Sequence, residues 1–357
     1  MNVVVYQRSK PQHRIKTYLF LCMCSLSIYS YAQDLHFSQY FANPLSYNPA
    51  NTGFFEGSYR LGVNHKQQWP WAIEGKFLNY NSSSAYADFS ILDKKINNLD
   101  WAGIGFNFIN DQAGDGNLIA NKAYMSMAYH KGLDELHQHF LSVGFQIAYV
   151  SRSINFGALY FNNQWLDEVG FDLSLPSNEG LYTEQTSYFD IGIGLQGKNQ
   201  LNDKLGLSYG VSLLHVNQPI ESFYNQNNRL GMRQLYQAGL VYKIKGKFDI
   251  SSSLFITSQK KAIELLLGSL AGFNLKQTPN HKTAKLYVGL FYRLKDALSP
   301  IFGYQYHKTR ILLNYDINLS KLSKASRGNG GFELSLIQIG VFKKKKNQAY
   351  KTHCPSF

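Results

Sequence analysis

The sequence predicts an all-β protein, a transmembrane antiparallel β-barrel of about 14 strands with an N-terminal non-strand segment in or near its lumen. Three observations support this fold class. Apolar residues alternate with small or polar residues in short segments from residue 57 to residue 342. Turns rich in Asn, Asp, Gly or Lys separate these segments. Aromatic residues make up 15% of the chain, which fits the aromatic girdles of outer-membrane barrels.

The alternation has a period of two residues, which is typical of β-strands. In one segment Val143, Phe145 and Ile147 fall on one face, whereas Gly144 and Gln146 fall on the other. A second face that carries mostly Gly, Ser, Asn and Gln fits a barrel with a polar interior and an exterior in contact with lipid. The alternative is a soluble periplasmic all-β protein, which extraction without detergent would identify.

The predicted strands are 58–68, 82–92, 101–110, 121–130, 140–151, 187–197, 205–216, 233–244, 248–257, 262–275, 285–294, 300–307, 310–319 and 332–342. Their number is even, as in single-chain bacterial barrels. The longer connections follow odd-numbered strands, at 69–81, 111–120, 152–186, 217–232 and 320–331. Outer-membrane barrels have short periplasmic turns and longer exterior loops, so these long connections are expected outside the cell. The short connections 258–261 and 295–299 are exceptions.

The chain begins with a predicted signal peptide over residues 1–32. Basic residues precede an apolar stretch over 18–28, and the small residues Ser30 and Ala32 mark a cleavage site. No apolar run of about 20 residues follows, so membrane-spanning helices are not expected.

Three further segments are predicted: an N-terminal arm or plug at 33–56, the barrel at 57–342 and a basic C-terminal tail at 343–357. The net charge of the whole chain is +13. Four Lys or Arg residues lie in the signal peptide and five Lys lie in the tail, so residues 33–342 carry 13 − 4 − 5 = +4. The basicity belongs to the two ends, and no nucleic-acid partner is indicated.

Motif searches do not indicate an enzyme. Gly192, Gly194 and Gly197 match the spacing of the dinucleotide fingerprint, but that motif needs a helix directly after the strand, and here another strand follows. Residues 111–117 resemble a calcium loop in composition but lack the final bidentate Glu. The metalloprotease motif HExxH does not occur. We therefore expect no catalytic residue, no metal and no cofactor.

The N-terminal segment 33–56 cannot be a barrel strand, because Asn43-Pro44 and Asn48-Pro49 place two helix-breaking turns in it. It is either a periplasmic arm for a partner or a plug in the lumen. We favour an insertion into the lumen or its mouth, because exposure of its aromatic side chains to water is unfavourable. These residues are His36, Phe37, Tyr40, Phe41 and Tyr47.

This opening also carries a specific resemblance. Residues 33–53 resemble the start of the PorP/SprF family of type IX secretion system outer-membrane proteins of Bacteroidetes. The motif residues are His36, Phe37, Gln39, Asn43, Pro44, Asn48, Pro49 and Gly53. Residues 64–70, 103–114 and 331–336 and the chain end at 353–357 are also similar to the family. Phe332 stands where relatives usually carry His, and Ser356 where they more often carry Arg.

The resemblance implies a protein of the cell outer membrane that is a component of, or an accessory to, the type IX secretion system. Members of the family are linked with export or surface attachment of large adhesins, and in some species with gliding motility. The implied partners are a secreted adhesin or its C-terminal sorting domain, other components of the system, and outer-membrane lipid. The resemblance supplies no catalytic residues. The second interpretation is a passive or substrate-specific porin.

The exterior loops are the expected contact region for a protein partner, with 69–81, 152–186 and 217–232 as the best candidates. Aromatic side chains dominate the energetics of protein interfaces. The predicted partner-binding residues are therefore Trp69, Trp71, Trp165, Phe223 and Tyr224.

Overall fold

The structure is a computed structural model of the 357-residue chain. It describes residues 37–69, 80–92, 99–114, 116–179, 182–224, 226–244, 248–275, 284–321 and 323–342. The predicted signal peptide, the basic tail, His36 and Trp71 lie outside the described residues.

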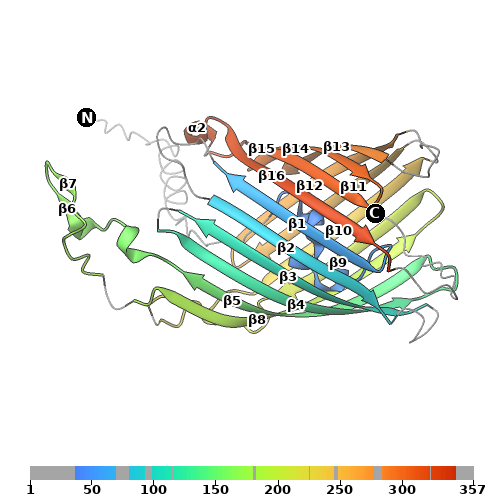
Figure 1. The fold of residues 1–357 in the computed structure, drawn as a ribbon, viewed down its shortest axis with the longest axis horizontal. Helices are drawn as coiled ribbons and strands as arrows, with labels where there is room; N and C mark the ends of the chain where they lie inside the picture. The colour runs from blue at the N-terminus through green and yellow to red at the C-terminus, as the bar shows by residue number, and fades with distance from the viewer. Residues whose placement is uncertain are drawn as a thin grey trace, which may run out of the picture. The chain divides into compact units, whose positions relative to one another are not determined.

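The described residues form a closed antiparallel β-barrel of 14 strands, as the sequence predicted (Figure 1). Each strand pairs with its neighbours along the chain, and β1 closes the barrel by pairing with β16, from Tyr59 opposite Gly340 to Gln68 opposite Gly331. The strands are β1 (Tyr59–Gln68), β2 (Tyr80–Ile91), β3 (Trp101–Ala113), β4 (Leu118–Gly132), β5 (His139–Ser153), β8 (Gln185–Gln200), β9 (Leu205–Leu214), β10 (Arg233–Ile244), β11 (Phe248–Gln259), β12 (Ala262–Asn274), β13 (Ala284–Arg293), β14 (Ala297–Tyr306), β15 (Thr309–Asn318) and β16 (Asn329–Gly340). Closure pairs every strand edge, which a barrel requires in a membrane.

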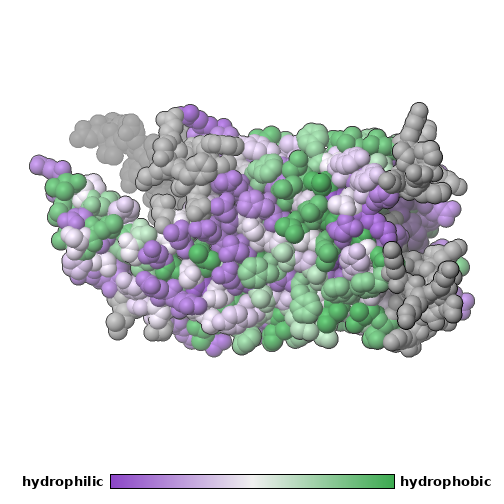
Figure 2. Space-filling model, viewed as in Figure 1, coloured by the Kyte–Doolittle hydropathy of each residue, from purple (hydrophilic) through white to green (hydrophobic). Residues whose placement is uncertain are grey.

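The period-two alternation of the sequence corresponds to the two faces of the barrel wall. On β5 the side chains of Val143 and Phe145 are 51% and 47% exposed, whereas Ser142 and Gln146 are each 1% exposed. Figure 2 shows hydrophobic residues gathered on the outer face over the strands. An apolar exterior around a polar interior is the arrangement expected of a barrel in lipid.

The connections differ between the two ends of the barrel. The longest described connection joins β5 to β8, and the connection from β9 to β10 opens at the same end. At the other end His307 and Lys308 alone join β14 to β15. We call these the long-loop end and the short-turn end. The predicted loop at 111–120 is shorter in the structure, because β3 and β4 both extend into it.

The connection from β5 to β8 contains elements that the sequence analysis did not predict. Two 3-10 helices, η4 (Phe156–Ala158) and η5 (Asn162–Gln164), precede a small hairpin of β6 (Trp165–Leu166) and β7 (Gly170–Phe171). Each hairpin strand has two residues, which is too short for an alternation to appear in the sequence. Another short helix, α2 (Ser323–Ser326), lies between β15 and β16.

Residues 37–58, which we call the lumenal segment, lie inside the barrel and appear in blue in Figure 1. They form three 3-10 helices, η1 (Tyr40–Ala42), η2 (Pro44–Ser46) and η3 (Pro49–Asn51). Pro44 and Pro49 each open a helix, where a missing N–H costs no hydrogen bond. Asn48 caps η3 by accepting a hydrogen bond from the Ala50 N–H at 2.9 Å. The predicted position of this segment in the lumen is therefore confirmed.

Among the described helices, none is both long and apolar enough to cross a membrane.

Candidate functional site

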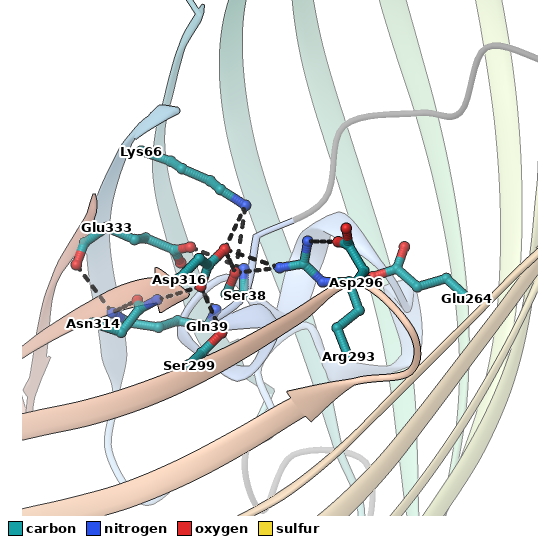
Figure 3. Close-up of polar contacts among 10 residues, drawn as sticks. All are labelled: Ser38, Gln39, Lys66, Glu264, Arg293, Asp296, Ser299, Asn314, Asp316 and Glu333. Carbon is teal, nitrogen blue, oxygen red and sulfur yellow. Dashed lines mark hydrogen bonds and ion pairs between the residues drawn. The ribbon is translucent and has the colours of Figure 1, made fainter. Parts of the chain in front are cut away.

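The start of the lumenal segment is bound by the barrel wall through Glu333 of β16 (Figure 3). The Glu333 carboxylate accepts hydrogen bonds from the backbone N–H groups of Ser38 and Gln39, at 2.9 and 3.0 Å. The Gln39 side chain donates to Asn314 at 2.6 Å. Glu333, Ser38 and Gln39 are fully buried, so these hydrogen bonds replace water that the groups have lost.

Charged side chains from several strands surround this anchor. Asp316 of β15 lies 3.1 Å from Arg293 of β13 and 3.5 Å from Lys66 of β1. The Ser38 hydroxyl donates to Asp316 at 2.6 Å and accepts from Arg293 at 2.6 Å. Arg293 also pairs with Asp296 at 2.8 Å. Figure 3 shows these groups converging on Ser38 from different strands.

We call Lys66, Arg293, Asp316 and Glu333 the anchor cluster. All four side chains are buried, and each has a charged or hydrogen-bonding partner. Removing one partner from a buried ion pair typically costs about 3–5 kcal/mol, because the other charge stays buried. The cluster thus holds the first residues of the lumenal segment in one position.

The end of the lumenal segment has its own polar contacts. Asp88 of β2 accepts from the Gly53 N–H at 2.8 Å and pairs with Arg60 of β1 at 2.7 Å. Arg60 also donates to the Asn51 carbonyl at 3.2 Å. His130 of β4 lies 2.7 Å from the Thr52 carbonyl oxygen. These groups come from β1, β2 and β4, so the end of the segment is bound to one side of the barrel wall.

Glycines on the inner wall allow the backbone of the lumenal segment to approach closely. A Cβ atom at Gly103 would lie 2.0 Å from the Thr52 carbonyl oxygen. At Gly144 it would lie 2.3 Å from the Ala50 nitrogen, and at Gly194 2.0 Å from the Asn48 side-chain oxygen. Gly194 belongs to the sequence match with the dinucleotide fingerprint. It lies within β8 and provides space for the segment.

Aromatic packing completes the interior. Tyr40 stacks on Phe255 of β11 with ring centroids 4.7 Å apart, and Phe41 lies 5.5 Å from Phe291 of β13. Nearer the end of the segment, Phe54 stacks on Trp101 of β3 at 5.7 Å. The family-motif residues Phe37, Gln39, Asn43, Pro44, Asn48, Pro49 and Gly53 are all buried within the barrel.

The β6–β7 hairpin and its flanks carry an exposed apolar surface beyond the ends of β5 and β8 (Figure 1). Trp165 is 53% exposed and packs edge to face with Phe171 at 4.9 Å. Val169 at the turn is 76% exposed. We name this surface the aromatic hairpin; it consists of Tyr160, Trp165, Leu166, Val169, Phe171 and Leu173.

The other predicted partner-binding residues have different environments. Phe223 and Tyr224 pack against Phe156 of η4, with ring centroids 6.3 and 6.0 Å away, so the two long loops contact each other. Trp69 follows β1, where its backbone N–H donates to the Gly330 carbonyl at 2.7 Å. Trp165 therefore lies on the exposed hairpin, whereas Phe223 and Tyr224 lie in the β9–β10 connection and pack against the first residues of the β5–β8 connection. We call this packed region the base of the long loops.

Two observations bear on chemistry. Asp190 of β8 and His215 are buried and pair at 2.8 Å. In the part of the chain that the structure describes, no three His, Cys, Asp or Glu side chains are placed to hold a metal ion.

The family model described as "Type IX secretion system membrane protein PorP/SprF" matches residues 29–337, which is most of the chain. The chain belongs to the PorP/SprF family. As a member of this family with a closed barrel, it is an outer-membrane β-barrel of the type IX secretion system, as the resemblance implied.

Solved structures with a similar barrel are distant in sequence. The toluene transporter TbuX of Ralstonia pickettii is 9% identical, over 82% of this chain and 91% of that chain, with a TM-score of 0.45. The toluene transporter TodX of Pseudomonas putida is 10% identical, over 82% and 91%, with a TM-score of 0.46. The KdgM porin is 7% identical, over 78% and 98%, with a TM-score of 0.36. No curated protein sequence matches the chain.

The anchor cluster was not predicted from the sequence, although one of its residues lies in a segment that the sequence analysis singled out. Glu333 lies in the Gly331-Phe332-Glu333 segment that resembles a PorP/SprF motif, and it contacts the family's N-terminal motif in the structure. Lys66, Asp316 and Glu333 all occupy positions that the alternation assigns to the inner face. Charged residues on the inner face of predicted strands could have indicated a buried polar site here.

Proposed function

We propose that this PorP/SprF barrel binds a large secreted adhesin, or its C-terminal sorting domain, and helps to export it or anchor it at the cell surface. The observation that carries the proposal is the aromatic hairpin at the long-loop end. Exposed aromatic residues are typical anchors of protein interfaces. The topology rule for outer-membrane barrels assigns this end to the cell exterior.

The composition of the hairpin supports a protein partner. The apolar residues Trp165, Val169 and Phe171 lie beside the exposed acids Asp167 and Glu168. An apolar centre with a polar rim is the usual anatomy of a protein interface. A cluster of exposed apolar side chains on a loop in contact with water generally marks an interaction site.

The base of the long loops is ordered by contacts between the β5–β8 and β9–β10 connections, and this order favours binding of a protein partner. Arg152 forms an ion pair with Glu221, and the Tyr188 hydroxyl donates to the same carboxylate at 2.6 Å. The Thr183 N–H donates to the Phe223 carbonyl at 2.7 Å. A loop that is already ordered loses less conformational entropy when a partner binds. Phe223 and Tyr224 contribute to this base.

The second candidate is a passive or substrate-specific porin. The observation that favours it is a cavity of about 420 Å³ inside the barrel, beside the lumenal segment. The burial of the lumenal segment against many strands argues against free passage of solutes. Single-channel conductance in planar bilayers separates the two candidates: a stable open-channel current in the unmodified protein supports the porin.

The test of adhesin binding compares cells that carry the unmodified protein with cells that carry Trp165→Ala together with Phe171→Ala. We expect a large secreted protein to move from the cell surface to the medium, or to disappear from both, as measured by quantitative proteomics of the two fractions. The control is Leu136→Ala, which removes an even more exposed apolar side chain at the short-turn end. Unchanged surface proteins in the double variant, with normal barrel levels, would overturn the proposal.

A further inference from the structure

The cavity of about 420 Å³ lies between the lumenal segment and the short-turn end of the barrel. Its lining includes Arg60 near the start of β1, Ile339 near the end of β16, and His307 and Lys308 of the β14–β15 turn. The topology rule assigns this end to the periplasm. The volume falls within the range of sites for small molecules, about 300–1,000 Å³.

Aromatic rings form much of the cavity wall. Tyr40, Phe41 and Tyr47 come from the lumenal segment, and Tyr287 and Phe291 come from β13. Phe55 also lines the cavity, with the Arg60 guanidinium carbon 4.8 Å from its ring centroid. A wall of this kind accommodates an apolar or aromatic body.

Tyr86 and Arg310 lie in the same row of paired residues across four neighbouring strands. Tyr86 of β2 lies opposite Gly62 of β1, which lies opposite Ile337 of β16, which lies opposite Arg310 of β15. The Tyr86 ring lies over Gly62, where a Cβ atom would be 2.2 Å from it. Gly62 thus lets the Tyr86 hydroxyl extend toward Arg310. Three strand spacings of about 4.8 Å separate the two backbones, a distance that the two long side chains can cover from opposite sides.

The Tyr86 hydroxyl can form a further hydrogen bond. The Tyr86 side chain is 4% exposed, and its hydroxyl has no hydrogen-bond partner among the described residues. A buried hydroxyl without a partner is costly, which indicates a ligand or solvent partner. Gln237, which also lines the cavity, has a buried side-chain oxygen in the same situation.

Arg310 provides a positive charge that no described carboxylate neutralises. Its Nε donates to Gln305 at 3.1 Å, and its guanidinium carbon lies 4.7 Å from the Tyr287 ring centroid. Arg60, another cation of the lining, is instead paired with Asp88. Of the acids that line the cavity, Asp249 is paired with Lys285.

We propose that this cavity binds an aromatic carboxylate, either a free aromatic acid or the C-terminal residue of a peptide. The carboxylate accepts hydrogen bonds from the Arg310 guanidinium and the Tyr86 hydroxyl, and the ring lies among Phe41, Tyr47 and Phe55. Guanidinium groups bind carboxylates in a planar bidentate geometry, and such charge-assisted hydrogen bonds are the strong ones. This inference is independent of adhesin binding at the long-loop end.

The test is isothermal titration calorimetry of the full chain in detergent. One probe is N-acetyl-L-phenylalanine, and its matched control is N-acetyl-L-phenylalaninamide, which lacks the carboxylate. We expect the acid to bind and the amide to bind at least about tenfold more weakly, because the charge-assisted hydrogen bonds are lost. Equal binding of acid and amide, or no binding of either acid or peptide, overturns the proposal.

Three variants locate the site. Arg310→Gln is expected to weaken binding of the acid at least about tenfold, and Tyr86→Phe several-fold. Arg229→Gln removes an exposed arginine from the β9–β10 connection at the other end of the barrel and should leave binding unchanged. Tyr86→Phe keeps the ring over Gly62, so it tests the hydroxyl even if Arg310→Gln fails to fold. Unchanged affinity in Tyr86→Phe, together with unchanged affinity in a folded Arg310→Gln, overturns the assignment of the site.

A pair of peptides distinguishes the two sources of the ligand. A hexapeptide that ends in Phe with a free carboxylate is compared with the same hexapeptide carrying a C-terminal amide. Tighter binding of the free-carboxylate peptide than of N-acetyl-L-phenylalanine supports the proposal and assigns the end of a chain as the ligand. Binding of the small acid without binding of the peptide supports the proposal and assigns a free acid.

Discussion

The Glu333 carboxylate of β16 accepts hydrogen bonds from two consecutive backbone N–H groups, of which the Ser38 N–H is 2.9 Å away. This contact joins the closing strand of the barrel to the first described residues of the lumenal segment. The two residues are 295 positions apart in the sequence but in direct contact in the barrel. The start of the segment should therefore be held less firmly when this side chain is changed.

We expect Glu333→Gln to loosen the lumenal segment. The amide keeps one acceptor oxygen but replaces the other with a donor, which faces a backbone N–H. Leaving a buried donor without its partner costs about 1–3 kcal/mol. The measurement is thermal unfolding in detergent together with conductance in planar bilayers, where a lower melting temperature and more frequent openings are expected. Glu135→Gln, at an exposed position of the β4–β5 turn, is the control. Identical melting and conductance in Glu333→Gln would contradict the role of the anchor cluster.

The barrel could be predicted because its signal is local. The exposed Phe145 and the buried Gln146 are neighbours in the chain, and an alternation of this kind predicts a two-faced wall wherever it repeats. Asn43-Pro44 and Asn48-Pro49 likewise predicted a segment that is not a strand. The burial of its aromatic residues correctly favoured the lumen.

The contacts that hold the segment could not be predicted, because they depend on which strands face one another. Arg293 and Ser38 are 255 residues apart in the sequence, yet their side chains lie 2.6 Å from each other. Strand register across the lumen decides such pairs, and alternation alone does not give it. The β6–β7 hairpin was missed for a different reason. Its strands have two residues each, too few for an alternation to repeat.

We expect Gly103→Ala to displace the end of the lumenal segment. The added methyl group would lie 2.0 Å from the Thr52 carbonyl oxygen, which belongs to the backbone and cannot move alone. Overpacking of this kind typically costs about 1–3 kcal/mol. Thermal unfolding in detergent measures the change. The control is Gly206→Ala on β9, where the nearest atom is the end of the Gln200 side chain at 3.1 Å. Equal destabilisation by the two substitutions would show that the close contact with Thr52 does not cause the loss of stability in Gly103→Ala.

We expect Phe145→Lys to destabilise the barrel in lipid. Phe145 is near the middle of β5 and is 47% exposed on the outer face, so the substitution places a charge in the hydrocarbon region. The cost for Lys near the bilayer midplane is about 2–4 kcal/mol. It is measured as the change in the free energy of unfolding in lipid bilayers by urea titration. Leu136→Lys, in the turn between β4 and β5, should cost far less, since that end meets water. A Phe145→Lys cost no larger than that of Leu136→Lys would contradict lipid contact at this face.

The Arg60–Asp88 pair offers a test of how the end of the lumenal segment is held. Asp88 is completely buried; it accepts from Arg60 at 2.7 and 3.0 Å and from the Gly53 N–H at 2.8 Å. Asp88→Asn leaves the Arg60 charge buried without its counter-charge, for which about 3–5 kcal/mol of destabilisation is typical. Arg60→Gln leaves Asp88 with the Gly53 N–H alone, which should also be costly. The double variant removes both charges and is expected to be less destabilised than the sum of the two single variants. The coupling energy, obtained from thermal or denaturant unfolding of the four proteins, measures the interaction. Additive costs would mean that the two side chains act independently, and that Gly53 is held by Asp88 without help from Arg60.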